Sequence, residues 1–177
     1  MTYRKEPAKK KSPVRYLLAL LAAALLLLAL WCGGVFGMPR QKLMDEFSAY
    51  PALPDGWNST FAIGDELAAC IRYKDGGPDC TASIYINRPG HSFGWFFRYG
   101  GSVHAGETTV EVLYIEGVGE SVLLCPDGAG VSRLEAENAS QNLPYGHPFA
   151  LVLPADMGAF TLYDANGNEV EYLSRFV

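Results

Sequence analysis

The stretch "LAACIRYKDGGPDCTASIYIN", residues 67–87, decides the fold of this chain. Two runs that are rich in apolar and β-branched residues flank the polar centre "KDGGPD". Glycine accepts the positive φ of a tight turn and proline interrupts a strand ladder, so this centre predicts a turn between two antiparallel strands. The stretch therefore predicts a β-hairpin.

The same pattern of apolar runs and turn residues continues on both sides of the hairpin. Runs of β-branched and aromatic residues recur about every 8 to 12 residues, separated by Gly, Pro, Asn or Asp, and helical periodicity between them is weak. We expect strands over residues 59–63, 67–73, 81–87, 93–99, 108–115, 121–125, 131–136, 149–153, 160–163 and 169–173. An α/β fold would need helical patterns between the strands, so we predict an all-β fold, an antiparallel β-sandwich of two sheets.

The run "FALVLPADMGAFTLYDANGNEV", residues 149–170, supports this architecture. Its Asn166-Gly167 pair is the strongest short signal for a two-residue hairpin. With a strand, a turn marked by proline and a "DANGNEV" hairpin in succession, the run resembles the closing strands of bacterial immunoglobulin-like and fibronectin-like surface modules. The resemblance covers about 22 of the 177 residues and implies an Ig-like sandwich, without implying a function.

Ahead of the predicted sheets lies the uncharged run "YLLALLAAALLLLALWCGGVFGM", residues 16–38. As a helix it would reach roughly 34 Å, enough to cross a hydrocarbon core of about 30 Å. A helix buried in a soluble core normally keeps a polar stripe, which this run lacks, so we predict a transmembrane helix. Cleavage as a signal peptide near Val35-Phe36-Gly37 is the alternative; the apolar run is long for such a peptide, and we favour an uncleaved signal anchor.

The charges are divided unevenly about this run. Residues 1–15 carry six of the 14 Lys and Arg residues and a single acidic residue, whereas residues 39–177 carry eight basic and 18 acidic residues, a balance of −10. The positive-inside rule then leaves the N-terminus in the cytoplasm and exports the remainder. An acidic body also argues against nucleic acid as a partner, because phosphate binding needs clustered positive charge.

These patterns divide the chain into four parts. Residues 39–56 begin with a short segment of mixed charge and end with Pro51, Pro54 and Gly56, which predicts a short helical turn and then a stiff tether ahead of the strands. We predict a basic cytoplasmic stub over residues 1–15, a transmembrane helix over 16–38, a tether over 39–56 and an exported all-β domain over 57–177.

The segment "PGHSFGWFFRYGG", residues 89–101, contains the pattern G-x-S-x-G from Gly90 to Gly94. In α/β-hydrolases this pattern places a nucleophilic serine on a sharp turn from a strand into a helix. Here Pro89 interrupts the approach and the following residues are poor helix formers, so we predict a turn that leads into a strand. A serine hydrolase that uses Ser92 with Asp127 and His147 is the alternative.

Four aromatic residues in the same segment, Phe93, Trp95, Phe97 and Tyr99, follow one another at every second position. In a regular strand they share one face, with Arg98 on the other. We expect this face to form sandwich core. The alternative is an exposed platform for a sugar ring or a partner protein, with Arg98 as a polar anchor.

The cysteines suit an exported domain. Cys70 and Cys80 lie symmetrically about Asp75, and directly opposite positions of a hairpin bring β-carbons within bridging distance. We therefore predict a Cys70–Cys80 disulfide in an oxidising compartment, with Cys125 as a buried apolar residue.

The sequence indicates neither a metal site nor a cofactor. Histidine and cysteine residues are scattered rather than spaced as zinc ligands. Asp164, Asn166 and Asn168 imitate the start of a calcium loop, but Arg175 stands where the bidentate acid should be.

The function expected from these patterns is that of a single-pass membrane protein whose exported domain is a non-enzymatic binding or scaffolding module at the cell envelope. Expected partners are membrane lipid, through the N-terminal helix, and another envelope protein or a glycan. The alternatives are the serine hydrolase and an accessory subunit of a membrane complex that contacts its partner through the span.

Overall fold

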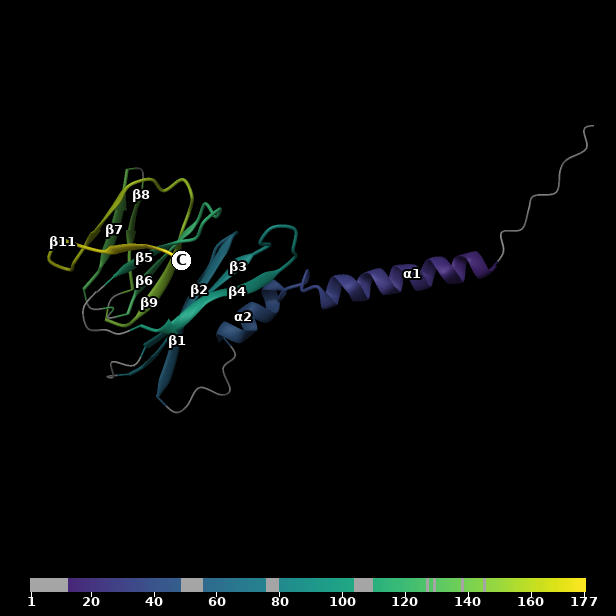
Figure 1. Cartoon of the computed structure of the whole chain (residues 1–177). Helices are drawn as coiled ribbons and strands as arrows, with labels where there is room; N and C mark the ends of the chain where they lie inside the picture. Colours follow the sequence, from purple (N-terminus) through teal and green to yellow (C-terminus); the bar gives the residue numbers. More distant parts are fainter. Residues whose placement is uncertain are drawn as a thin grey trace, which may run out of the picture. The chain divides into compact units, whose positions relative to one another are not determined.

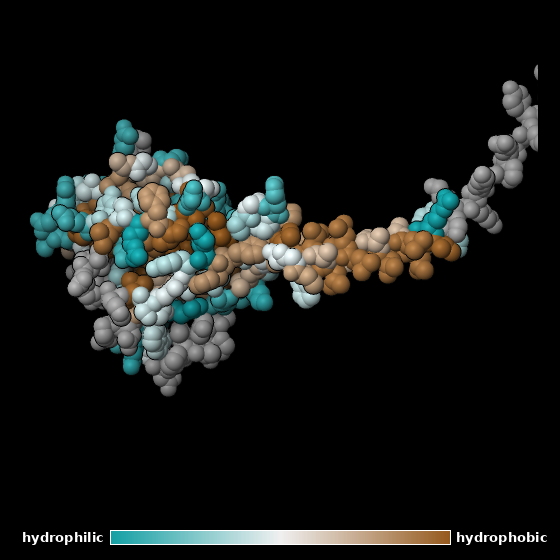
Figure 2. Space-filling model, in the orientation of Figure 1, coloured by the Kyte–Doolittle hydropathy of each residue, from teal (hydrophilic) through white to brown (hydrophobic). Residues whose placement is uncertain are grey.

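The computed structural model describes residues 13–48, 56–75, 80–103, 110–126, 128, 130–137, 139–144 and 146–177 (Figure 1). The chain divides into two compact units, Met1–Phe36 and Gly37–Val177. The first contains helix α1 (Pro13–Cys32), in which no residue is buried. This helix is long and apolar enough to cross a membrane, and its surface in Figure 2 is apolar over most of its length.

Helix α1 ends at Cys32, before the predicted limit of the span at Met38. The N–H of Gly34 donates to Trp31 O (3.1 Å) and that of Val35 to Leu30 O (3.2 Å). These two bonds form a Schellman motif, which ends a helix and turns the chain away from its axis. The apolar helix therefore runs over Pro13–Cys32 rather than over the predicted residues 16–38.

The predicted tether begins with a second helix, α2 (Arg40–Ser48), which packs on the strands that follow it. We call the strands and turns from residue 56 to residue 177 the β body. Leu43 and Phe47 lie one turn apart on the same face and are fully buried. Their cluster includes Ala68, Cys70, Tyr85 and Trp95 from the strands. Residues 40–48 are thus a docked amphipathic helix; residues 49–55 lie outside the described residues.

A partly buried hydrogen bond strengthens the contact between α2 and the strands. The hydroxyl of Tyr85 donates to Glu46 Oε1 at 2.7 Å. Burial, followed by this hydrogen bond, raises the pKa of Tyr85 well above its ordinary value. Helix α2 is therefore tied to the strands by a polar contact as well as by apolar packing.

The described strands form three four-stranded sheets. The first sheet has the order β1-β2-β3-β4, formed by β1 (Trp57–Ile63), β2 (Leu67–Lys74), β3 (Cys80–Asn87) and β4 (Trp95–Ser102). The second sheet has the order β12-β5-β6-β9, formed by β5 (Glu111–Tyr114), β6 (Ser121–Cys125), β9 (Phe149–Leu153) and β12 (Leu173–Phe176). The third sheet has the order β11-β10-β7-β8, formed by β7 (Arg133–Ala136), β8 (Ala139–Asn142), β10 (Phe160–Tyr163) and β11 (Glu169–Val170).

The strand pairs run antiparallel, apart from the parallel pair β5 and β12. The prediction of a mostly β fold built of antiparallel sheets behind an apolar N-terminal helix is thus confirmed, but the described strands form three sheets where two were predicted. The hairpin predicted over residues 67–87 is present as β2 and β3, which pair from Leu67↔Ile86 to Tyr73↔Cys80. The Ig-like assignment remains a prediction.

Alternate residues of the second sheet contribute to two apolar clusters. One cluster joins the first sheet to the second and includes Leu67, Ile71, Ile84, Leu113 and Leu124. The other joins the second sheet to the third and includes Val112, Leu123, Phe149, Leu134 and Leu162. This alternation is the period-2 pattern of strands that are covered on both faces. The third sheet contributes its inner face alone to these clusters.

Two glutamates clasp the β1–β2 turn to the β5–β6 turn. The carboxylate of Glu120 accepts hydrogen bonds from the backbone N–H groups of Asp65 (2.8 Å), Glu66 (2.9 Å) and Leu67 (2.7 Å). In return, the carboxylate of Glu66 accepts the N–H of Gly119 at 2.8 Å. We call Glu66 and Glu120 the carboxylate clasp. Each carboxylate accepts hydrogen bonds from backbone N–H groups of the turn that carries the other glutamate.

Candidate functional site

The G-x-S-x-G pattern forms the connection between β3 and β4. Ser92 Oγ donates to Pro89 O at 2.7 Å, which closes the turn on itself, and strand β4 follows at Trp95. Gly94 has a φ of 91°, and a Cβ there would lie 2.8 Å from Met38 O. Turn geometry and a close backbone approach therefore account for Ser92 and Gly94, and a strand follows where a nucleophile elbow would have a helix.

The structure does not bring Ser92 and His147 together. The ring of His147 stacks on Tyr73 with centroids 6.3 Å apart, and Tyr73 pairs with Cys80 at the first residue of β3. Ser92 follows the opposite end of β3, which is eight residues long and spans roughly 23 Å. Asp127, the third residue of the hypothetical triad, lies outside the described residues.

A β-bulge in β4 divides the aromatic stripe between two faces. Strands β3 and β4 pair in order as far as Tyr85↔Phe97, after which the register shifts so that Ile84 pairs with Tyr99. Arg98 is the extra residue, and a bulge of this kind reverses the alternation of side chains beyond it. The prediction that the four aromatic residues share one face is therefore wrong.

The residues of the stripe have different environments. Trp95 is 4% exposed and packs beneath α2, whereas Tyr99 packs on the opposite face, against the cluster of the first and second sheets. Phe97 lies edge-on to Tyr85 at 5.6 Å but is 61% exposed, and Phe93 is 58% exposed. The core interpretation thus holds for Trp95, while Phe93 and Phe97 remain in contact with solvent.

Cys70 and Cys80 do not form the predicted disulfide, and both thiols are free. Cys70 pairs with Ser83 and Cys80 with Tyr73, because the register of the hairpin is centred beyond Asp75. The two thiols also belong to clusters on opposite faces of the sheet. Burial raises the pKa of each to about 11, so neither is reactive near neutral pH.

Asp164, Asn166 and Asn168, which imitate the start of a calcium loop, stabilise the β10–β11 turn by hydrogen bonds. The carboxylate of Asp164 accepts hydrogen bonds from the N–H of Asn166, the N–H of Asn168 and the Asn168 side-chain amide. The bonds from Asn168, followed by those from Asn166, lower the pKa of Asp164. These contacts form the local turn that the Asn166-Gly167 pair predicts.

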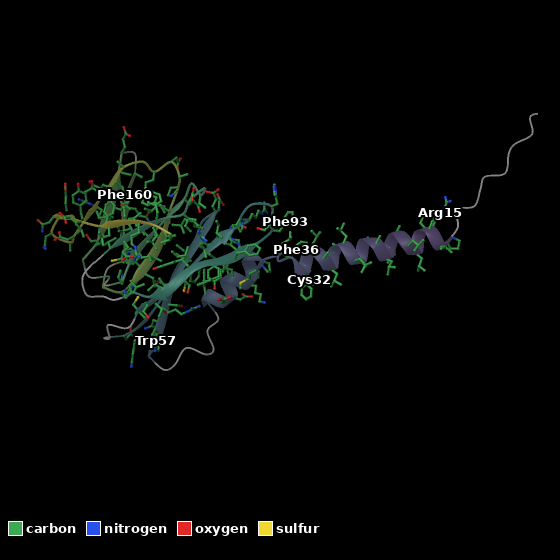
Figure 3. All side chains as sticks on the ribbon, viewed as in Figure 1. Arg15, Cys32, Phe36, Trp57, Phe93 and Phe160 are labelled. Atoms are coloured by element: carbon green, nitrogen blue, oxygen red, sulfur yellow. The ribbon has the colours of Figure 1, made fainter. Side chains whose placement is uncertain are left out.

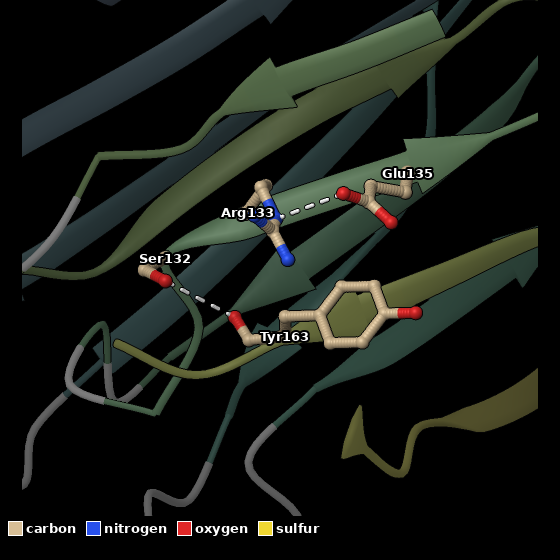
Figure 4. Close-up of polar contacts among 4 residues, drawn as sticks. All are labelled: Ser132, Arg133, Glu135 and Tyr163. Carbon is tan, nitrogen blue, oxygen red and sulfur yellow. Dashed lines mark hydrogen bonds and ion pairs between the residues drawn. The ribbon is translucent and has the colours of Figure 1, made fainter. Parts of the chain in front are cut away.

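The outer face of the third sheet carries a polar and aromatic group of side chains (Figure 4). Arg133 on β7 pairs with Tyr163 on β10, and its guanidinium carbon lies 4.8 Å from the centre of the tyrosine ring. Arg133 Nε lies 3.2 Å from Glu135 Oε1, and the two charged side chains are 41% and 40% exposed. Arg133, Glu135 and Tyr163 form what we call the β7–β10 face, which combines a flat ring with accessible charges of both signs.

An open cavity of about 370 Å³ lies at the β11 edge of the same sheet. Its lining includes Phe160, labelled in Figure 3, and Tyr172, whose rings stack with centroids 5.0 Å apart. Glu169 and Glu171 add carboxylates to the lining. Stacked rings beside hydrogen-bond acceptors suit a ligand with an apolar face and polar edges.

Sequence reasoning missed both the β7–β10 face and this cavity. The hairpin signal of Asn166-Gly167 places β10 beside β11, but no local signal places β7 on the other side of β10. Among the described residues, no group of three or more His, Cys, Asp or Glu could hold a metal ion. No family model matches this chain, and neither a curated protein nor a solved structure matches it.

Proposed function

We propose that this protein is a membrane-anchored module whose β body lies outside the cytoplasm and binds a partner at the cell envelope. The apolar surface of α1 supports the anchor, because no residue of this helix is buried within the chain. Five basic residues precede α1 and Arg15 lies in its first turn, whereas the balance after the helix is acidic, which supports export of the body by the positive-inside rule.

The single observation that carries the binding role is the outer face of the third sheet. Among the described elements, α2 and the second sheet cover the two faces of the first sheet, and the first and third sheets cover those of the second. Among the described residues none covers the β7–β10 face, where the guanidinium carbon of Arg133 lies 4.8 Å from the centre of the Tyr163 ring. We assign this face, with the adjoining cavity, to an envelope protein or a glycan.

The serine hydrolase has less support from the geometry. Ser92 and His147 lie at opposite ends of β3, and the hydroxyl of Ser92 is engaged by Pro89 O. An Ig-like sandwich remains our proposal for the β body, supported by the apolar clusters that neighbouring sheets share.

The location is tested by cysteine labelling in intact cells. In a Cys32→Ser background, we expect a membrane-impermeant maleimide to label Asn142→Cys, because Asn142 is exposed on β8. The matched variant Ser12→Cys, ahead of the span, should be labelled after permeabilisation only. Burial protects the three remaining cysteines, Cys70, Cys80 and Cys125, from the reagent. The reverse labelling pattern would place the β body in the cytoplasm and refute the proposal.

The binding surface is tested by photo-crosslinking. We expect a photoreactive phenylalanine analogue at position 163 to form a heavier adduct in intact cells. The matched control is the same analogue at Phe176, an aromatic residue that is 82% exposed on β12. Arg133→Ala should lower the yield at position 163, since it removes the cation above the ring. Equal yields at positions 163 and 176 would contradict a binding role for the β7–β10 face.

A further inference from the structure

We propose that the connection between β3 and β4, residues 88–94, docks on the surface of the bilayer that α1 spans, with the ring of Phe93 in the interfacial layer of the lipid. This inference rests on the proposed membrane anchor and adds a second contact of the protein with lipid. It concerns the segment that contains the G-x-S-x-G pattern, which is not part of the β7–β10 face and has no part in the binding role proposed above.

The chain that leaves α1 is hydrogen-bonded to this connection. The N–H of Gly37 donates to Phe93 O at 2.7 Å. Met38 and Trp95 exchange two backbone hydrogen bonds, each 2.8 Å long, as an isolated antiparallel bridge. The end of the β3–β4 connection is therefore fixed to the first residues of the second unit.

Chain length limits the distance between this connection and the end of α1. The five steps from Cys32 to Gly37 span at most about 18 Å when fully extended. The bonds from Gly34 to Trp31 and from Val35 to Leu30 shorten this reach, because they turn the chain back on the helix. If α1 spans the bilayer, the covalent chain keeps Phe93 close to its surface, whatever the orientation of the two units.

The basic residues of the second unit gather around the same connection. Four of the eight basic residues after position 38 are found there: Arg40 and Lys42 on α2, Arg88 at the end of β3 and Arg98 in the bulge of β4. All four are exposed. Helix α2 also carries Asp45 and Glu46, but residues 87–103 contain no acidic residue, whereas the remainder of the unit has four basic and 16 acidic residues. The electrostatic attraction of the unit to anionic headgroups is therefore strongest around this connection.

The exposed aromatic rings complete the surface. Phe93 is 58% exposed and Phe97 is 61% exposed, and Figure 3 shows Phe93 on the connection before β4. Segments that lie on a bilayer bury Phe side chains at the boundary between headgroups and acyl chains, and neighbouring Arg side chains can bind phosphate while their stems cover apolar groups. Aromatic rings beside basic residues, held close to a span, fit lipid rather than a soluble partner.

The test uses the full chain in vesicles of phosphatidylcholine and phosphatidylglycerol. A spin label is attached to Phe93→Cys in the Cys32→Ser background, and the matched control carries it at Phe176→Cys, the exposed aromatic residue of β12. We expect the label at position 93 to collide with a water-soluble nickel chelate about tenfold less often than the control label, a factor that corresponds to about 1.4 kcal/mol. It should collide more often with oxygen, which concentrates in lipid.

A second variant keeps the docking side chain in place. A label at Phe97→Cys leaves Phe93 unchanged, and we expect it to be protected from the nickel chelate as well. Replacing Arg88 and Arg98 together by serine should reduce this protection in the anionic vesicles. Equal nickel accessibility of the labels at positions 93, 97 and 176 would overturn the proposal.

Vesicle flotation after an alkaline wash separates this inference from the anchor on which it rests. A chain that floats with the vesicles while its label at position 93 is open to water has a membrane anchor but no docked connection, which overturns the further inference alone. A chain that does not float overturns the membrane anchor and the docking proposal with it.

Discussion

Replacement of Phe47 by alanine is expected to destabilise the second unit by about 3 to 5 kcal/mol, the usual cost of removing a buried phenylalanine ring. Phe47 is fully buried, and its ring centre lies 5.5 Å from that of Phe61 and 5.6 Å from that of Tyr85. No other residue of α2 places an aromatic ring in the cluster. Urea titration of the full chain in a mild detergent, followed by tryptophan emission, measures the loss.

The matched control for Phe47→Ala is Met44→Ala. Met44 lies on the same helix but is 37% exposed, so its truncation should cost less than about 1 kcal/mol. A loss from Phe47→Ala as small as that expected for Met44→Ala would mean that the packing of α2 does not contribute to stability. The segment would then behave as the tether that the sequence alone predicts.

The strands are the part of the fold that the sequence predicts best. The runs at residues 121–125, 149–153 and 160–163 form strands with the predicted bounds. Each combines β-branched or aromatic residues with a turn signal at its ends, so that local propensity and long-range burial favour the same structure. Strand β8 (Ala139–Asn142) was not predicted, because its four residues are all exposed and it has no apolar alternation to detect.

The failures share a physical cause, since each depends on pairing register or on a distant partner. The bulge at Arg98 and the register of the β2–β3 hairpin decide which face a side chain occupies, and no residue type signals either one. The stretch at residues 169–173 was predicted as one strand, but the chain leaves the third sheet after Val170 and joins the second at Leu173. Composition alone does not reveal such a crossing.

The candidate site was predicted less well than the fold for the same reason. Ser92 matches a sequence pattern, yet its role in the structure is to close a turn. Arg133 and Tyr163 match no pattern and are distant in the chain, but strand pairing brings them together. Short patterns identify local chemistry, whereas a surface assembled from two strands is visible only after the topology is known.

Loss of the carboxylate clasp is the second large effect that we expect. Glu120→Ala removes the acceptor of three backbone hydrogen bonds in the β1–β2 turn and should destabilise the second unit by about 2 to 3 kcal/mol. Glu120→Gln should have a smaller effect, because one oxygen can still accept the N–H groups of Glu66 and Leu67. Urea titration of the full chain in detergent again provides the measurement.

The two halves of the clasp should be energetically coupled. Glu66 binds the turn that carries Glu120, and Glu120 binds the turn that carries Glu66, so either truncation disorders the group that the other carboxylate needs. A double-mutant cycle of Glu66→Ala and Glu120→Ala should therefore give a coupling energy above about 0.5 kcal/mol. Glu116→Ala, at an exposed position of the β5–β6 turn, should change stability by less than about 0.5 kcal/mol. Additive losses from Glu66 and Glu120 would show that the two turns are held independently, and that the first and second sheets are joined by their apolar cluster alone.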